Sequence, residues 1–94
     1  MTSQTQVEFG SIEGSARDAA GRALPDVAVF IKAADQPHPD IAALSGPDGR
    51  FRLTLLLPGS YILEAIGAAS RPVTIAVQVT AGSPTRIGVV FPSE

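Results

Sequence analysis

The side chains that could perform chemistry are few and scattered along the 94 residues. The single histidine, His38, lies in the stretch DQPHPD between Asp35 and Asp40, and these residue types could bind a metal ion or carry a proton. The prolines on either side favour an exposed, extended loop, so we interpret His38 as a solvated loop residue. No cysteine is present, which excludes a disulfide framework and a thiolate metal site. The sequence therefore predicts no catalytic residue, no metal site and no cofactor.

Two arginines, Arg50 and Arg52, are spaced to lie on one face of a strand, where they could bind a carboxylate. Charged residues on the solvated face of a sheet are common, so we interpret the pair as solvent-facing. The stretch GPDG at 46–49 lacks the lysine and the following helix that a phosphate-binding loop requires. Its Asp48-Gly49 pair is typical of a tight turn and predicts a hairpin connection.

These residues are expected to lie on a sheet, because the dominant hydrophobic periodicity is two. Polar residues alternate with Phe51, Leu53 and Leu55, and residues 71–79 alternate in the same way. Stretches rich in Gly, Pro or Asp separate such runs. The runs predict seven strands, at about 7–17, 24–34, 41–45, 50–56, 60–66, 72–80 and 85–91. Strands at such intervals, without a helical pattern, predict an all-β antiparallel sandwich or barrel.

The stretch LPGSY predicts a turn followed by a buried tyrosine. Pro58 and Gly59 suit the central positions of a type II turn. Tyr61, Leu63 and Ala65 would then share the inward face of the next strand. We expect the ring of Tyr61 to pack in the core and its hydroxyl to bond to the backbone.

Strand alternation leaves several large apolar residues facing outward. If Val27, Val29 and Ile31 face the core, Phe30 faces out. By the same alternation Ile62, Ile66 and Val90 also face out, so the candidate interaction surface is Phe30, Ile62, Ile66 and Val90. The alternative is that these residues are scattered singly, or that a β-bulge reverses the alternation.

Length and charge exclude several classes of protein. Ninety-four residues predict one domain over 1–94, with an ordered core of about 7–91. The seven Lys and Arg are scattered in a chain of net charge −2, so we expect no binding of nucleic acid. No apolar run approaches the length of a spanning helix and no signal peptide is evident, so we expect no membrane insertion and a cytoplasmic location, with leaderless export as an alternative.

Two stretches, GSIEGSARDAAGRALPDVAVFI and GPDGRFRLTLLLPGSYILEA, carry a family resemblance. Together they resemble the carboxypeptidase regulatory-like domain, over about Ile12 to Phe91. The resemblance implies a seven-stranded antiparallel β-sandwich of the transthyretin-like Greek-key type. The matching residues, such as Gly49, Phe51 and Tyr61, are framework positions of the family. Asp26 departs from the pattern, because the family usually has glycine there.

Enzymes that share this fold need residues that the chain lacks. A 5-hydroxyisourate hydrolase needs more than one histidine, and an intradiol dioxygenase needs two tyrosines and two histidines around iron. A metallocarboxypeptidase needs two histidines and a glutamate around zinc. The chain has one histidine and one tyrosine, so we expect that it is not an enzyme.

Three hypotheses about function follow. The first is a non-catalytic protein–protein interaction or structural module, an accessory subunit of a larger bacterial assembly, for which we expect a protein partner or self-association and no small-molecule substrate. The second is a carbohydrate- or small-ligand-binding sandwich, which the low content of aromatic residues disfavours. The third is an enzyme of unknown type, for which no set of nucleophile, base and orienting group is visible.

Overall fold

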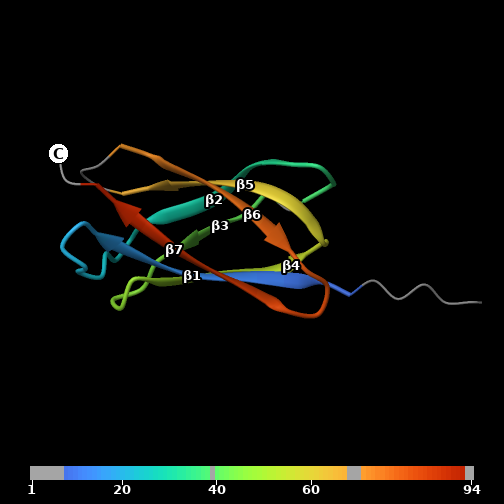
Figure 1. The fold of residues 1–94 in the computed structure, drawn as a ribbon, viewed down its shortest axis with the longest axis horizontal. Coiled ribbons are helices and arrows are strands. Elements are labelled where there is room, and N and C mark those ends of the chain that lie inside the picture. The colour runs from blue at the N-terminus through green and yellow to red at the C-terminus, as the bar shows by residue number, and fades with distance from the viewer. Residues whose placement is uncertain (1–7, 39, 68–70, 93–94) are drawn as a thin grey trace, which may run out of the picture.

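The computed structural model describes residues 8–38, 40–67 and 71–92, which form seven strands and, within those ranges, no helix (Figure 1). The strands are β1 (Gly10–Asp18), β2 (Ala28–Ala34), β3 (Ala42–Leu44), β4 (Arg50–Leu56), β5 (Gly59–Ile66), β6 (Val73–Val79) and β7 (Pro84–Phe91). They agree closely with the seven predicted segments. Val7, where the first strand and the ordered core were expected to begin, lies outside the described residues.

The strands form two sheets that pack face to face. One has three strands in the order β4-β1-β7, and the other has four in the order β3-β2-β5-β6. Figure 1 shows β1 and β4 along the lower side of the view and β2 and β5 above them. The predicted all-β, seven-stranded sandwich of the transthyretin-like Greek-key type is confirmed. One pair departs from the antiparallel expectation, because β1 and β7 run parallel.

The core lies between the two sheets. It consists mainly of every second residue along each strand, the one whose side chain points inward. Its buried apolar residues are Ile12, Ala16, Val27, Val29, Ile31, Phe51, Leu53, Leu56, Tyr61, Leu63, Ala65, Val77, Val79, Val89 and Phe91. Every strand except the short β3 contributes to this set. Aliphatic residues dominate, so the fold depends on close packing of two flat apolar faces.

One inward assignment was wrong, because β4 contains a β-bulge. Leu55 was predicted to be buried but exposes 67% of its surface, whereas Leu56 is fully buried. From Gly10 to Ile12 the pairing advances two residues in β1 but three in β4. The extra residue reverses the alternation, and Leu55 takes a left-handed backbone conformation with φ 60°.

The connections on either side of β4 join the two sheets and are not hairpins within one sheet. The stretch at 46–49 does form a tight turn, in which the backbone N–H of Gly49 donates to the carbonyl of Gly46 at 2.9 Å. It links β3 of one sheet to β4 of the other, so the predicted hairpin was wrong. The segment after β4 returns the chain to the four-stranded sheet at β5.

Gly59 begins β5 and does not form the predicted type II turn. Its φ is 152°, far from the ~80° of that turn type. The backbone N–H of Ser60 donates to Oδ1 of Asp35 at 3.2 Å. A Cβ at position 59 would collide with the side-chain amide of Gln36 and lie 2.7 Å from Oδ1 of Asp35. Glycine suits this position because other residues rarely adopt a φ of 152°, and the side chains of Asp35 and Gln36 also lie against it.

The segment before β2 is held by a buried serine and contains a strained aspartate. Ser45 Oγ accepts a hydrogen bond from the N–H of Val27 at 2.8 Å and donates to the carbonyl of Leu24 at 2.7 Å. Between them Asp26 has φ 61°, in the left-handed region. This is the position where the family pattern has glycine, and aspartate is among the few other residues that tolerate such angles.

Tyr61 occupies the position predicted for it. Its side chain is 1% exposed, and its hydroxyl donates a hydrogen bond of 2.6 Å to the carbonyl of Leu57. Leu57 lies directly after β4, at the crossing between the sheets. The tyrosine therefore ties that crossing to the core, and the predicted bond to the backbone is confirmed.

Candidate interaction surfaces

Three of the four apolar residues predicted to face outward share the outer face of the four-stranded sheet. Phe30 lies in β2, and Ile62 and Ile66 lie in the neighbouring β5. Phe30 pairs with Glu64, so the two isoleucines are two residues to either side of its partner. Each isoleucine exposes 40% of its surface, and Phe30 is half-buried. A bulge in β2 lies between residues 31 and 33, beyond Phe30, and leaves its orientation unchanged.

Leu44 extends this apolar surface onto β3. It is 66% exposed and pairs with Ala28, which in turn pairs with Ile66. Sequence reasoning missed Leu44 because β3 has only three residues, too few to show an alternation. We call Phe30, Leu44, Ile62 and Ile66 the outer apolar face.

A single ion pair interrupts the outer apolar face. The Nζ of Lys32 lies 3.4 Å from Oε2 of Glu64. The glutamate side chain is only 19% exposed, whereas that of the lysine is 56% exposed. The lysine therefore gives a partner to a carboxylate that apolar neighbours partly cover.

Val90 faces outward as predicted but lies on the opposite sheet. It is 58% exposed, and it belongs to β7, where it pairs with Arg17 of β1. The structure therefore brings Phe30, Ile62 and Ile66 together and leaves Val90 apart. The sequence shows in which direction a residue points along its strand but not to which sheet the strand belongs.

The outer face of the three-stranded sheet is rich in arginine. We call a set of residues paired across the three strands a row. In the first row, Glu13 of β1 lies between Arg52 of β4 and Arg86 of β7. Oε2 of Glu13 accepts hydrogen bonds from Nη2 and Nε of Arg52 at 2.6 and 3.1 Å, and Oε1 lies 3.7 Å from Nε of Arg86. The hydrogen bond from Arg52, with the charges of both arginines, holds the pKa of Glu13 below its ordinary value. The carboxylate that Arg52 was suited to bind is thus one of the protein's own.

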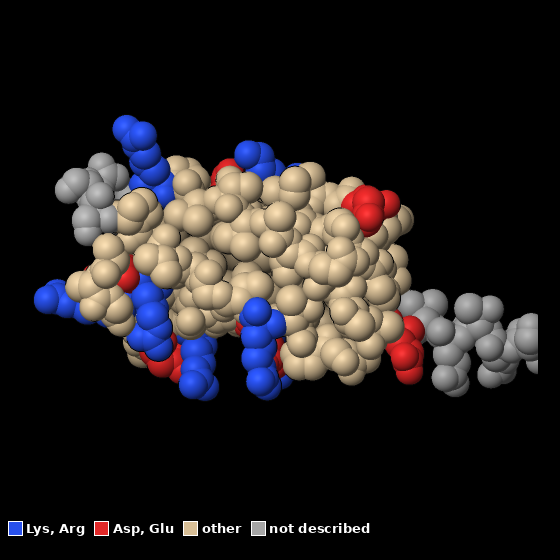
Figure 2. All heavy atoms as spheres, viewed as in Figure 1, with Lys and Arg blue, Asp and Glu red and all other residues tan. Residues whose placement is uncertain are grey.

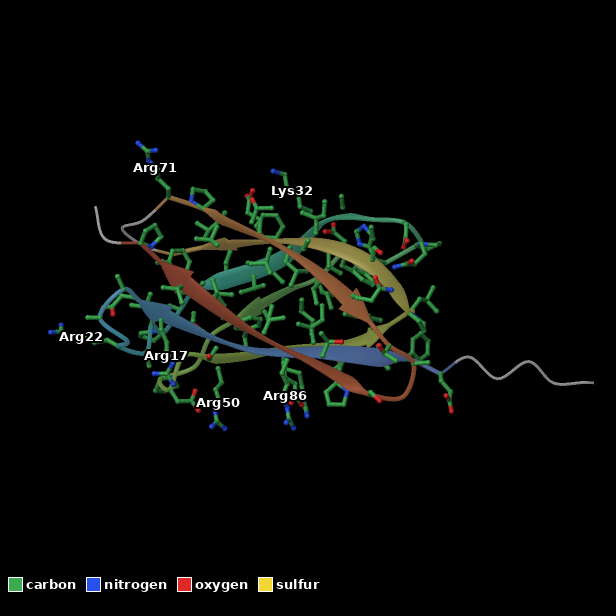
Figure 3. All side chains as sticks on the ribbon, in the orientation of Figure 1. Arg17, Arg22, Lys32, Arg50, Arg71 and Arg86 are labelled. Carbon is green, nitrogen blue, oxygen red and sulfur yellow. The ribbon has the colours of Figure 1, made fainter. Side chains whose placement is uncertain are left out.

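The next row has arginine but no carboxylate at its centre. Here Ser15 of β1 lies between Arg50 of β4 and Gly88 of β7. A hollow of about 430 Å³ opens at this place, lined by Glu13, Gly14, Ser15, Arg50, Arg86 and Ile87. Figure 3 shows Arg50 and Arg86 projecting from the same side of the molecule, opposite to Lys32.

Within the part of the chain that the structure describes, Arg50 forms one ion pair, and it is weak. Its Nε lies 3.7 Å from Oδ2 of Asp48, and the two side chains are 82% and 64% exposed. Water screens an ion pair as exposed as this one, which contributes about 0 to 1 kcal/mol. Arg50 can therefore turn to another anion at little cost.

His38 lies in the connection between β2 and β3 and is exposed, as expected for a loop residue. Among the described residues, no three His, Cys, Asp or Glu side chains gather where they could hold a metal ion. The same part of the chain has no helix with the length and hydrophobicity that crossing a bilayer requires.

Comparison with known families gives one clear match. The family model of the carboxypeptidase regulatory-like domain matches residues 11–92. A search of curated proteins finds no match.

Solved structures with the same fold come from several bacteria. The major pilin subunit BcpA of Bacillus cereus superposes with a TM-score of 0.74 at 12% identity, over 89% of this chain and 29% of that chain. The minor pilin GBS52 of Streptococcus agalactiae gives 0.70 at 14% identity, over 94% and 46%. A candidate carbohydrate-binding protein of Pseudomonas aeruginosa gives 0.53 at 17% identity, over 92% and 90%. The chain spans less than half of each pilin, and identities this low show a common fold alone.

Proposed function

Because the chain belongs to the carboxypeptidase regulatory-like domain family, we propose that it is a non-catalytic interaction or structural module, an accessory subunit of a larger assembly. The observation that carries this proposal is the outer apolar face, whose four residues lie on adjacent strands of one sheet. Another protein surface, from a different chain or a second copy, covers this face in the assembly. The absence of catalysis and a cytoplasmic location stay predictions.

Burial of the outer apolar face would favour association. Ile62 and Ile66 each expose 40% of their surface and Leu44 exposes 66%. Removing apolar surface from water contributes about 25 cal/mol per Å², and this gain must exceed the entropy that association costs. Apolar residues gathered on one face of a sheet often mark an interaction site. The central Lys32–Glu64 pair adds a charged feature that a partner can recognise.

Two of the proteins that share the fold support a role in assembly. GBS52 is a minor pilin and BcpA is a major pilin subunit. Each contains a unit of this fold within a longer chain. A sandwich of this type can thus be part of a protein subunit, which is the role proposed for this chain.

The second candidate is binding of a carbohydrate, which the neighbour from Pseudomonas aeruginosa favours. Binding sites for small ligands are lined mostly by apolar and aromatic side chains. Of the five aromatic residues here, Phe51, Tyr61 and Phe91 are buried and Phe30 is half-buried. Only Phe9 is largely exposed, at 46%, so we rank this candidate second.

The test removes the outer apolar face without altering the core. We expect the double substitution Phe30→Ser with Ile62→Thr to abolish self-association in sedimentation velocity, or to abolish recovery of protein partners from the native cell. Ile62→Thr with Ile66→Thr should do the same and leaves the half-buried ring of Phe30 in place. Val90→Thr is the matched control, because Val90 is an apolar residue on the opposite sheet that is more exposed than either isoleucine.

Each result bears on the proposal in a definite way. Loss of association in both double variants, with Val90→Thr unaffected, supports it. A wild type that stays monomeric at high concentration, together with variants that retain every partner, would refute it. Urea denaturation of each variant shows whether the fold is intact, so that a loss of binding is not mistaken for unfolding.

A further inference from the structure

The outer face of the three-stranded sheet is basic although the chain as a whole is acidic. Arg17, Arg50, Arg52 and Arg86 lie on it, opposed by Glu13 and by Asp48 in the adjoining turn. Subtracting these from seven Lys and Arg and nine Asp and Glu leaves three basic and seven acidic residues elsewhere in the sequence. Figure 2 shows Lys and Arg side chains along the lower margin of the molecule, and Figure 3 places Arg17, Arg50 and Arg86 there. Such a separation of charge favours an acidic partner on this face.

The two rows of this face differ in one respect. The first row places the carboxylate of Glu13 between two arginines, and Arg52 binds it through two hydrogen bonds. The second row has Ser15 at the equivalent place, with Arg50 on one side. The second row therefore has an arginine on β4, as the first row does, but no carboxylate on β1.

Two small residues make room for a ligand in the second row. Ser15 offers only a hydroxyl, and Gly88, its partner in β7, has no side chain. A Cβ at Gly88 would meet no other atom within 4 Å, so the space beside Ser15 is open. Ser15 also lines an adjoining hollow of about 430 Å³ together with Arg50 and Arg86, and arginine presents donors in a fork that fits a carboxylate.

We propose that this hollow binds a carboxylate of an acidic protein segment, held between Arg50 and Arg86 above Ser15. The side chain of Glu13, which also lines the hollow, opposes the continuous negative charge of a nucleic-acid backbone but leaves room for one carboxylate. Arg86 has free donor capacity, because its recorded contact with Glu13 is 3.7 Å long and its side chain is 81% exposed. The site lies on the opposite sheet from Phe30, Ile62 and Ile66, and it does not rest on the function proposed above. Leu44 and Arg50 together line a second hollow that both sheets share.

A fluorescent hexaglutamate peptide is a direct probe of the hollow. We expect fluorescence anisotropy to show binding at low salt that weakens towards physiological salt, since the contact is between exposed charges. Arg50→Gln with Arg86→Gln should weaken binding by about tenfold or more, as expected for loss of charge-assisted hydrogen bonds. Arg22→Gln with Arg71→Gln is the matched control, because it removes the same charge from two exposed arginines outside the hollow.

Ser15→Val separates a defined site from general attraction of charge. It places two methyl groups at the hollow that Ser15 lines and changes no charge, and valine is favoured in a strand. We expect it to weaken hexaglutamate binding as well, with an unchanged urea midpoint.

Several outcomes would overturn the proposal. They are a wild type that does not bind at low salt, a control pair that weakens binding as much as the Arg50 and Arg86 pair, and a Ser15→Val variant that binds like wild type. Tighter binding of single-stranded oligothymidylate than of hexaglutamate would overturn the assignment to an acidic protein segment. Ile62→Thr on the opposite face should leave hexaglutamate binding unchanged.

Discussion

The hydroxyl of Tyr61 contributes to the stability of the fold. Tyr61→Phe tests this contribution because it removes only the hydroxyl. The substitution keeps the buried ring and removes only the 2.6 Å bond to the carbonyl of Leu57. A buried carbonyl that loses its donor costs about 1 to 3 kcal/mol, and the half-buried state of Leu57 allows water to compensate in part. We therefore expect a loss of about 1 to 2 kcal/mol. A chain of this size has a total stability of about 5 to 14 kcal/mol.

Urea denaturation measures this loss directly. With a slope of about 1 kcal/mol per M for a small domain, Tyr61→Phe should lower the midpoint by about 1 M or more and leave the slope unchanged. Tyr61→Ala also removes the ring and should cost about 3 to 5 kcal/mol, so the difference between the variants separates ring from hydroxyl. An unchanged midpoint for Tyr61→Phe would refute the argument that this bond secures the crossing between the sheets.

Two further predictions concern the backbone and the charges. Asp26→Gly should raise the stability measured by urea denaturation by about 0.5 to 1 kcal/mol, because glycine adopts the φ of 61° without strain; a clear loss would show that the aspartate side chain is needed there. The free energy of unfolding should show coupling between Glu13 and Arg52 at pH 7. A double-mutant cycle with Glu13→Gln, Arg52→Gln and the double variant measures it by urea denaturation. The lowered pKa of Glu13 means that this contribution is lost as the pH falls below about 4, so coupling that persists at pH 2 would contradict the ion pair.

The strands could be predicted from the sequence because each buries one face. Alternation of apolar and polar residues marks a half-buried strand, and it correctly placed Val27, Val29 and Ile31 in the core. The same reasoning placed Tyr61 inside and Ile62 outside. These predictions depend only on local periodicity, which a single sequence contains in full.

The predictions that were wrong concern features that depend on contacts between distant segments. The bulge at Leu55 arises from the register of β4 against β1, and leucine at that position does not indicate a bulge. The side chains that lie against Gly59 belong to Asp35 and Gln36, in a loop more than twenty residues earlier. The division of the outward residues between two sheets follows from strand order, which alternation does not encode.

The division also separates the residues that hold the fold from those to which we assign binding. The residues that show the family resemblance, such as Gly49, Phe51 and Tyr61, lie in a turn or in the core, where packing and backbone geometry restrict them. The residues to which we assign binding, such as Ile62 and Arg50, lie on the outer faces and are free to vary without loss of the fold. Two sheets packed about 10 Å apart place the outer apolar face and the arginine hollow back to back. A partner on Ile62 and Ile66 therefore leaves the arginine hollow accessible, whereas a partner that also covers Leu44 reaches the second hollow, which Leu44 and Arg50 line together.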